Sequence, residues 1–247
     1  MPRASFRFYA ELNDFLLAAR RMVEFNHAFQ GRVSIKDMIE SLGVPHTEVD
    51  LILVNGLSVD FAYIVQADDR VSVYPVFEAL DITPLVRLRP RPLREPKFIL
   101  DTHLGRLANY LRLLGFDTLY RNNYDDEALA RLSAGEKRTL LTKDRGLLKR
   151  RIVTHGYCVR SADPQQQIKE VLERFDLLGA IAPFSRCLRC NGRLEPVEKQ
   201  AIVHRLPART SVDYDEFYRC TACDQLYWPG SHYVALERFV SEILTGR

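Results

Sequence analysis

The sequence predicts several domains of mixed α/β and α+β fold, and three observations support this fold class. The stretch from Thr83 to Pro96 contains four prolines and four arginines and separates two regions of different pattern. After it, short apolar runs alternate with helix-like segments, as in a parallel sheet covered by helices. Two Cys-x-x-Cys pairs follow in the last quarter of the 247 residues. The expected parts are residues 1–80, a linker at 81–96, residues 97–183 and residues 184–247.

The composition is that of a globular protein. Hydrophobic residues make up 47% and charged residues 27% of the chain, which provides enough apolar surface for packed cores. No stretch approaches the roughly 18 apolar residues of a membrane span, and the first residues contain no apolar run of the kind found in a secretory signal. Five cysteines in such a chain favour thiols or metal ligands over disulfides. We therefore expect a cytoplasmic protein with no membrane partner.

Charge is divided unevenly along the chain. Residues 1–80 contain 7 Lys and Arg against 11 Asp and Glu, a net charge of −4. Residues 81–247 contain 28 against 21, a net charge of +7. An excess of cationic side chains suits a polyanion such as RNA, because neutralised phosphates contribute affinity that does not depend on sequence. Ordinary surface charge that keeps the protein soluble is the alternative explanation.

The first 80 residues predict a small α+β domain. Strands are expected at Ser5–Ala10, Val49–Val54 and Val71–Phe77, where apolar residues alternate or run together. Ser34 can cap a short helix with Asp37 three residues later, and Gly43 can end that helix. The pair Asn55-Gly56 is a strong signal for a tight turn between two strands.

This order of strand, helix, hairpin and strand resembles a β-grasp, ubiquitin-like domain of the sulfur-carrier type. Sulfur carriers end in a free Gly-Gly tail whose carboxylate is activated. Here the corresponding end continues through Phe77 to Leu80 into the linker. The resemblance therefore implies a docking role with a protein partner rather than sulfur transfer.

Residues 97–183 predict repeated strand–helix units. The expected strands are Phe98–Leu100, Thr118–Tyr120, Thr139–Thr142 and Tyr157–Arg160. The expected helices are His103–Leu114, Asp126–Leu132, a short one from Arg145, and one opened by Pro164 with Asp163 as its cap. In a parallel sheet of this kind, ligands bind at the carboxyl ends of the strands.

Four aspartates are expected at that edge of the sheet. They are Asp101, Asp126, Asp144 and Asp163, and either Asp125 or Glu127 could replace the second. Clustered carboxylates repel one another unless a cation neutralises them, and hard oxygen ligands select Mg²⁺ or Mn²⁺. Such a site can activate water for attack on a phosphodiester. Taken singly, each acid could equally be a helix cap or a turn residue.

The same region resembles a known nuclease family. The runs LDTHLGRLANYLRLLGFDTLY, DDEALARL and RTLLTKDRGLLKRR are similar to the PIN-like ribonuclease fold. More narrowly, they resemble the RNase family named after the carboxy-terminal domain of the Mut-seven exonuclease, from residue 97 to about residue 235. The resemblance implies that Asp101, Asp126 and Asp144 bind a catalytic metal, with Asp163 as a fourth ligand, a water orienter or only a helix cap. Fusion to a ubiquitin-like domain also resembles bacterial members of this family.

The two cysteine pairs predict a structural zinc ribbon. Cys187 and Cys190 are separated by 29 residues from Cys220 and Cys223, and four thiolates at this spacing suit tetrahedral zinc. Four protein ligands leave no open coordination position, so the zinc would be structural. Strands are expected nearby at Ala201–His204 and Glu216–Arg219. The aromatic run 227–233 could stack on bases or pack on the ribbon.

The sequence therefore predicts a metal-dependent ribonuclease that acts on RNA, with single-stranded RNA as the expected substrate. Arg106, Lys143 and Arg145 are candidate phosphate contacts by position. The alternative is a non-catalytic RNA- or ribosome-binding adaptor that retains the zinc ribbon. A third interpretation is a protein-docking module centred on the β-grasp domain.

Overall fold

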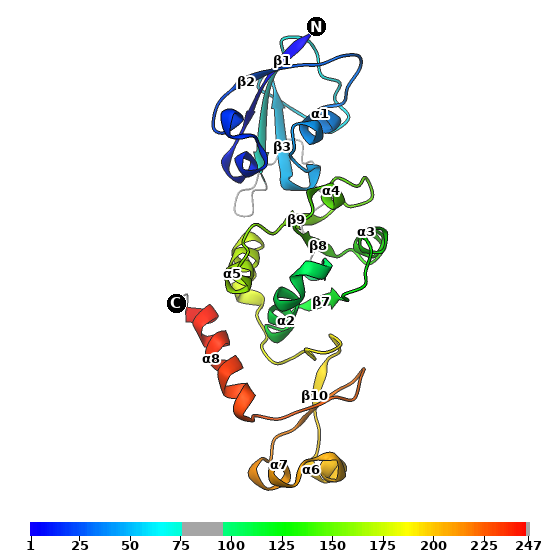
Figure 1. Ribbon diagram of the computed structural model, residues 1–247, viewed down its shortest axis with the longest axis vertical. Helices are drawn as coiled ribbons and strands as arrows, with labels where there is room; N and C mark the ends of the chain where they lie inside the picture. The colour runs from blue at the N-terminus through cyan, green and yellow to red at the C-terminus, as the bar shows by residue number, and fades with distance from the viewer. Residues whose placement is uncertain (76–95, 246–247) are drawn as a thin grey trace. The chain divides into compact units, whose positions relative to one another are not determined.

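The structure is a computed structural model that describes residues 1–75 and 96–245 (Figure 1). The predicted linker at 81–96 lies outside the described residues apart from Pro96. The chain forms two compact units, each interrupted in sequence: Met1–Glu95 with Asn123–Val159, and Pro96–Asn122 with Arg160–Arg247. The two units are described in turn.

The N-terminal part of the first unit is a five-stranded sheet with one helix. Its strands are β1 (Arg3–Phe8), β2 (Phe25–Ala28), β3 (Val49–Val54), β4 (Leu57–Val59) and β5 (Arg70–Pro75). Their order is β2-β1-β5-β3-β4, with β1 and β5 parallel and the other neighbours antiparallel. The helix is α1 (Ile35–Ser41), and the 3-10 turns are η1 (Ala10–Phe15), η2 (Ala18–Arg20) and η3 (His46–Glu48). The predicted strand, helix, hairpin and strand are all present, and β2 is an additional strand.

The core of this part lies between one sheet face and α1. Phe6, Phe8 and Val73 are buried on the sheet, and Ile35 and Ile39 are buried on the helix. As predicted, Ser34 caps the helix, because its hydroxyl accepts a hydrogen bond from the backbone N–H of Asp37 at 3.1 Å. The predicted turn also forms: φ is +51° at Asn55 and +86° at Gly56, as a type I′ turn between β3 and β4 requires.

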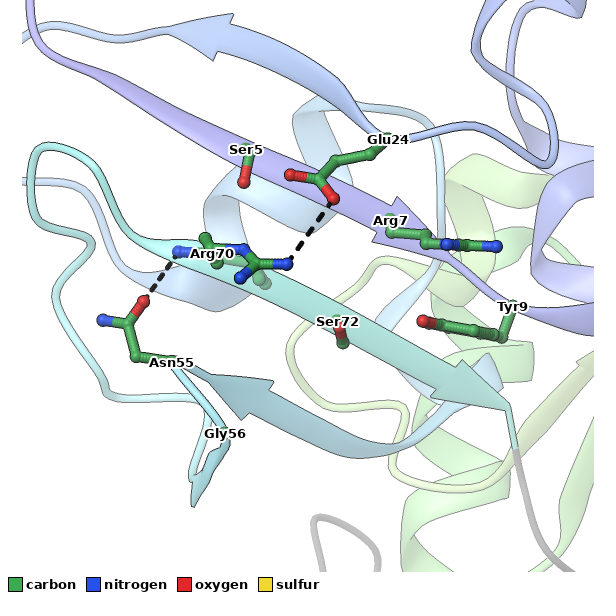
Figure 2. A pocket seen from close by; sticks show the side chains of 9 residues that line it. Ser5, Arg7, Tyr9, Glu24, Asn55, Gly56, Arg70 and Ser72 are labelled. Atoms are coloured by element: carbon green, nitrogen blue, oxygen red, sulfur yellow. Dashed lines mark hydrogen bonds and ion pairs between the residues drawn. The ribbon is translucent and has the colours of Figure 1, made fainter.

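On the opposite face of the sheet, a hollow lies over the paired strands β1 and β5 (Figure 2). A cavity of about 590 Å³ lies there. Its lining residues are Ser5, Arg7, Tyr9, Glu24, Asn55, Gly56, Arg70, Val71 and Ser72.

The second part of the first unit consists of α3 (Asp126–Gly135), β8 (Thr139–Thr142), α4 (Arg145–Leu148) and β9 (Gly156–Cys158). β8 and β9 are parallel, with Leu141 opposite Tyr157. β9 ends two residues before the predicted Arg160. Cys158 is buried, as expected for a small hydrophobic side chain.

The ubiquitin-like part and this second part are joined by buried polar contacts. Oε1 of Glu48, a fully buried residue, accepts a hydrogen bond from the backbone N–H of Cys158 at 2.7 Å. The Lys149 ammonium donates to the backbone carbonyl of Glu40 at 2.7 Å. Nε2 of His46 lies 3.0 Å from the Val153 carbonyl oxygen. These contacts explain why one compact unit includes segments more than 100 residues apart in sequence.

The first part of the second unit, residues 96–122 and 160–183, again has parallel strands and helices. Its elements are β6 (Lys97–Leu100), η4 (Thr102–Leu104), α2 (Gly105–Leu113), β7 (Asp117–Tyr120), α5 (Pro164–Arg174) and η5 (Leu178–Ala180). β6 and β7 are parallel, and α2 packs against α5. Leu107 and Leu111 on α2, and Ile168 and Val171 on α5, are buried. The parallel strand pairs in both units agree with the predicted α/β class.

The cysteine region completes the second unit. Its elements are β10 (Leu194–Pro196), α6 (Lys199–Ile202), η6 (Val203–Arg205), α7 (Ala208–Asp213), β11 (Tyr218–Cys220), β12 (Leu226–Tyr227) and α8 (Ser231–Thr245). The strand order is β10-β11-β12. The strand predicted at 201–204 is wrong, because that segment is helical. Ile202, the last residue of α6, is buried against Phe217, and Leu206, which follows η6, packs on the same cluster. β11 begins two residues later than predicted.

We predict that Glu48→Ala lowers the free energy of unfolding by about 1–3 kcal/mol, because the buried Cys158 N–H loses its acceptor. Urea denaturation measures this quantity. Glu24→Ala is the matched control. The Glu24 side chain is 45% exposed and lies 4.0 Å from Arg70, so its loss should cost less than about 0.5 kcal/mol. Equal losses in the two variants would contradict the buried contact.

Candidate functional site

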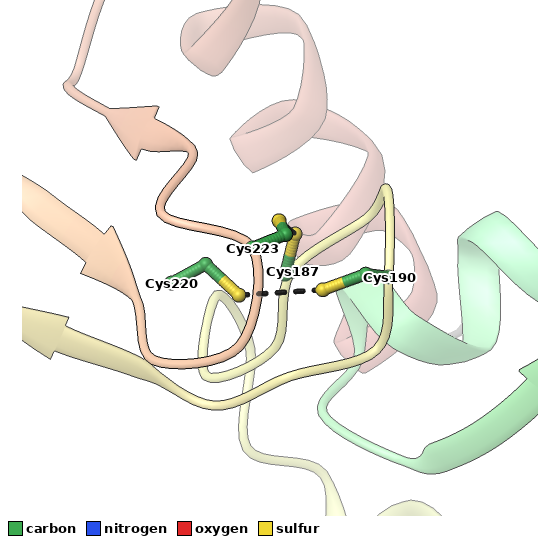
Figure 3. A group of neighbouring side chains, drawn as sticks. All are labelled: Cys187, Cys190, Cys220 and Cys223. Carbon is green, nitrogen blue, oxygen red and sulfur yellow. Dashed lines mark hydrogen bonds between the residues drawn. The ribbon is translucent and has the colours of Figure 1, made fainter.

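The four predicted cysteine ligands come together at one point of the second unit (Figure 3). Their sulfur atoms all lie within 4.8 Å of one another. The Cys190 and Cys220 sulfurs are 3.4 Å apart, and those of Cys187 and Cys223 are 3.6 Å apart. One pair lies in the loop before β10, and the other lies where β11 ends and the chain turns toward β12. Four cysteines are thus placed to hold a metal such as zinc.

The local geometry fits a tetrahedral thiolate site. With zinc–sulfur bonds of about 2.3 Å, the sulfurs of a regular tetrahedron are roughly 3.8 Å apart, close to the shorter distances here. Backbone N–H groups point at two sulfurs: Gly192 donates to Cys190 at 3.5 Å and Ala222 to Cys220 at 3.4 Å. A Cβ at Gly192 would lie 2.7 Å from the Cys220 sulfur and 2.8 Å from the Ala222 Cβ. Only a glycine lets the two loops approach this closely.

The thiols differ in acidity. Burial raises the pKa of Cys187, but hydrogen bonds from the Tyr227 hydroxyl at 3.1 Å and from backbone N–H groups outweigh burial and lower it to about 7. Burial, together with the neighbouring thiols, raises the pKa of Cys190 to about 12. Cys187 therefore ionises more readily than Cys190. Further thiolates in so small a volume need a cation to offset their repulsion.

Polar side chains fasten the cysteine loop to β7. The Asn191 carboxamide oxygen accepts from the backbone N–H of Thr118 at 2.9 Å, and its nitrogen donates to Asp117 at 2.8 Å. Arg112 donates to the carbonyls of Thr118 at 3.0 Å and Leu188 at 2.9 Å. Burial lowers the pKa of Arg112, although the adjacent cysteines oppose this shift. The supporting roles of Asn191 and Arg112 were not predicted from the sequence. For Asn191 the sequence contains one signal, the Asn-Gly dipeptide that follows Cys190, which is typical of a tight turn.

Two candidate catalytic acids belong to the second unit. Asp101 directly follows β6 and is 9% exposed, and its Oδ1 accepts from the Thr102 hydroxyl at 3.0 Å. Asp163 is exposed and caps α5 as predicted, with Oδ2 accepting from the Gln166 N–H at 2.9 Å.

The other two acids belong to the first unit. Asp144 caps α4, since its Oδ1 accepts from the Gly146 N–H at 2.6 Å. Asp126 lies in the first turn of α3 and forms an ion pair with Arg150 at 3.7 Å. Asp125, weighed as its replacement, is instead the cap of α3. The cysteine cluster contains none of the four candidate aspartates. That these aspartates share one metal ion remains a prediction.

Comparison with protein-family models now identifies the chain. Residues 96–240, more than half of the sequence, match the model described as the Mut7-C RNAse domain. The chain belongs to the Mut7-C RNAse family. Residues 1–81 match the model described as Mut7-C ubiquitin. Both matches confirm the resemblance found in the sequence, and the first supports a ribonuclease-type function. No curated protein and no solved structure matches the chain.

The candidate phosphate contacts of this Mut7-C protein have different surroundings. Arg106 on α2 and Lys143 before α4 are exposed. The Arg145 guanidinium instead donates to the carbonyls of Phe15 at 3.2 Å and Asp14 at 3.3 Å and lies over the Phe15 ring. Arg145 is exposed as well and also binds the ubiquitin-like part, so a phosphate contact at this residue stays a prediction.

The aromatic run of the Mut7-C RNAse region packs on the protein. Trp228 joins the cluster around Phe217. Tyr233 lies 4.5 Å from Phe184, measured between ring centroids. These contacts favour packing over base stacking for this run. Among the described residues, no helix has both the length and the apolar character needed to cross a membrane.

We predict that Gly192→Ala weakens zinc binding at least about tenfold, because the added Cβ pushes apart the two metal-binding loops. Competition with a chromophoric chelator measures the affinity. Gly179→Ala is the control, because a Cβ at that glycine meets no atom within 4 Å. Unchanged zinc affinity in Gly192→Ala would show that the loops tolerate a wider separation.

Proposed function

We propose that the protein is a metal-dependent ribonuclease that hydrolyses phosphodiester bonds in single-stranded RNA. The observation that carries this proposal is the match of residues 96–240 to the Mut7-C RNAse domain. The net charge of +7 over residues 81–247 supports it, because a cationic protein attracts a polyanionic substrate.

The proposed catalytic residues are Asp101, Asp126, Asp144 and Asp163 in a PIN-like arrangement. In this proposal they hold Mg²⁺ or Mn²⁺, which would activate water and stabilise negative charge on the phosphate. Local geometry is compatible with this role. Each of these two carboxylates uses one oxygen for its cap hydrogen bond: Oδ1 in Asp144 and Oδ2 in Asp163. The second oxygen of each carboxylate can bind a cation. The cap bonds would also orient these carboxylates.

We infer that the cysteine site binds zinc in a structural role. The support comes from four thiol ligands at tetrahedral spacing and from N–H groups directed at their sulfurs. The zinc would fix the loop that Asn191 and Arg112 fasten to β7 and would thus brace the nuclease region. Cysteines must stay reduced to bind a metal, and the cytoplasm keeps thiols reduced, which supports the proposed cytoplasmic location.

The proposed phosphate contacts are Arg106, Lys143 and Arg145, because all three are exposed. The ubiquitin-like domain would also bind a protein partner. The alternative function, a non-catalytic RNA- or ribosome-binding adaptor, is favoured by one observation. The cap hydrogen bonds of Asp144 and Asp163 account for these two acids without a metal.

We predict that Asp144→Asn abolishes Mg²⁺- or Mn²⁺-dependent cleavage of single-stranded RNA. The amide removes a negative charge from the metal site, yet asparagine still caps a helix, so the fold should persist. Cleavage of a labelled oligoribonucleotide, with and without added metal, measures the effect.

The matched control is Asp213→Asn, which changes an exposed aspartate at the end of α7 and should leave cleavage unchanged. Equal cleavage by wild type and Asp144→Asn would indicate a contaminating nuclease. RNA binding by both without cleavage by either would favour the adaptor.

A further inference from the structure

The outward face of the ubiquitin-like sheet is cationic although its domain is acidic. Along β1 and β5, buried residues alternate with more exposed ones. The more exposed residues are Arg3, Ser5 and Arg7 on β1 and Arg70, Ser72 and Tyr74 on β5. This set contains three arginines and no acid, whereas residues 1–80 carry a net charge of −4. Two of these arginines, Arg7 and Arg70, line the hollow of the sheet, and Glu24 is the one acid that lines it.

Polar groups in this hollow are available to a ligand. The Arg70 side chain is 77% exposed, and its contact with Glu24 is a weak pair at 4.0 Å (Figure 2). Arg7 is exposed as well. The Ser5 hydroxyl also lines the cavity, but its oxygen is buried and is not counted as a ligand contact. Two exposed cations at a cavity of about 590 Å³, against the single acid Glu24, suit an anionic group.

Aromatic rings lie beside these cations. Tyr9 and Tyr74 are stacked, with their ring centroids 4.3 Å apart and their planes at 10°. The Arg7 guanidinium lies 5.2 Å from the Tyr9 ring centroid (Figure 2). Aromatic rings and guanidinium planes are the groups on which unpaired bases stack.

We propose that this face binds single-stranded RNA, with phosphates at Arg7 and Arg70 and a base stacked on the Tyr9–Tyr74–Arg7 group. This proposal rests on the proposed ribonuclease function, because that function is what makes RNA the expected ligand. An acidic peptide would use the arginines but not the stacked rings, so RNA matches more of the surface. The ubiquitin-like domain then holds the substrate strand for the nuclease.

The test is fluorescence anisotropy of a short labelled oligouridylate with the full, zinc-loaded chain and no added Mg²⁺ or Mn²⁺. The double variant Arg7→Gln/Arg70→Gln should lose at least about tenfold in affinity. The slope of log affinity against log salt should flatten by about 1.4, since each phosphate contact on a single strand contributes about 0.7. Arg32→Gln is the matched control, because it removes an exposed arginine of the same domain outside this cavity.

Two tyrosine variants test stacking. Tyr9→Leu should lower affinity at least about fivefold, whereas Tyr9→Phe should retain it, because phenylalanine also stacks on a base. Loss in Tyr9→Leu with retention in Tyr9→Phe supports the proposal. Equal affinity of wild type and the double arginine variant overturns it. Polyglutamate binding as tight as oligouridylate binding, with the same losses, also overturns it in favour of a protein partner.

Cleavage assays on the same proteins separate this proposal from the ribonuclease proposal. If RNA binding depends on Arg7, Arg70 and Tyr9 while the wild type cleaves no RNA, the binding face stands and the ribonuclease proposal fails. If the wild type cleaves RNA while binding does not depend on these three residues, the binding face is overturned and the ribonuclease proposal stands.

Discussion

The constraint on which the second unit depends is the crowding of four sulfur atoms within 4.8 Å. Thiols this close can ionise together only when a cation offsets their repulsion, so metal binding at these cysteines would be coupled to folding of the region. The consequences extend beyond the ligands. Gly192 must lack a side chain because two loops meet at the sulfurs. Asn191, the residue before Gly192, connects this crowded loop to β7, because its side-chain oxygen accepts a hydrogen bond from the backbone N–H of Thr118.

The candidate catalytic acids illustrate how one residue can serve two requirements. Asp144 and Asp163 each begin a helix by accepting a backbone N–H, so each contributes to stability where it stands. A carboxylate fixed in this way has its orientation set before any ligand arrives, which would lower the entropic cost of assembling a metal site. Arg145, one residue after Asp144, ties the same helix to Phe15. The ubiquitin-like part therefore helps to hold the helix that Asp144 begins.

Several features of the fold and of the cysteine site could be predicted from the sequence, because each depends on local chemistry. The cap at Ser34, the turn at Asn55-Gly56 and the paired cysteines are each specified by a few neighbouring residues, and the structure confirms them. The strand expected at 201–204 is wrong: Ile202 and Val203 have high strand propensity, yet this segment is helical and buries Ile202 against Phe217 while Val203 is exposed. The roles of Arg112, Arg145 and Glu48 could not be predicted, since their partners lie far away in sequence or in the backbone of another element.

The hydrogen bond between Glu48 and Cys158 also has a consequence for synthesis of the chain. Its partners are 110 residues apart, and at typical elongation rates of about 5–20 residues per second the glutamate is made roughly 5–20 s before its donor. Until then, Glu48 and His46 present polar groups that the finished protein buries. The nascent ubiquitin-like domain can form its sheet early but reaches its final polar pairing only after β9 emerges. The last step in folding of this domain therefore depends on a contact of high sequence separation, even though its sheet can form in the order of synthesis.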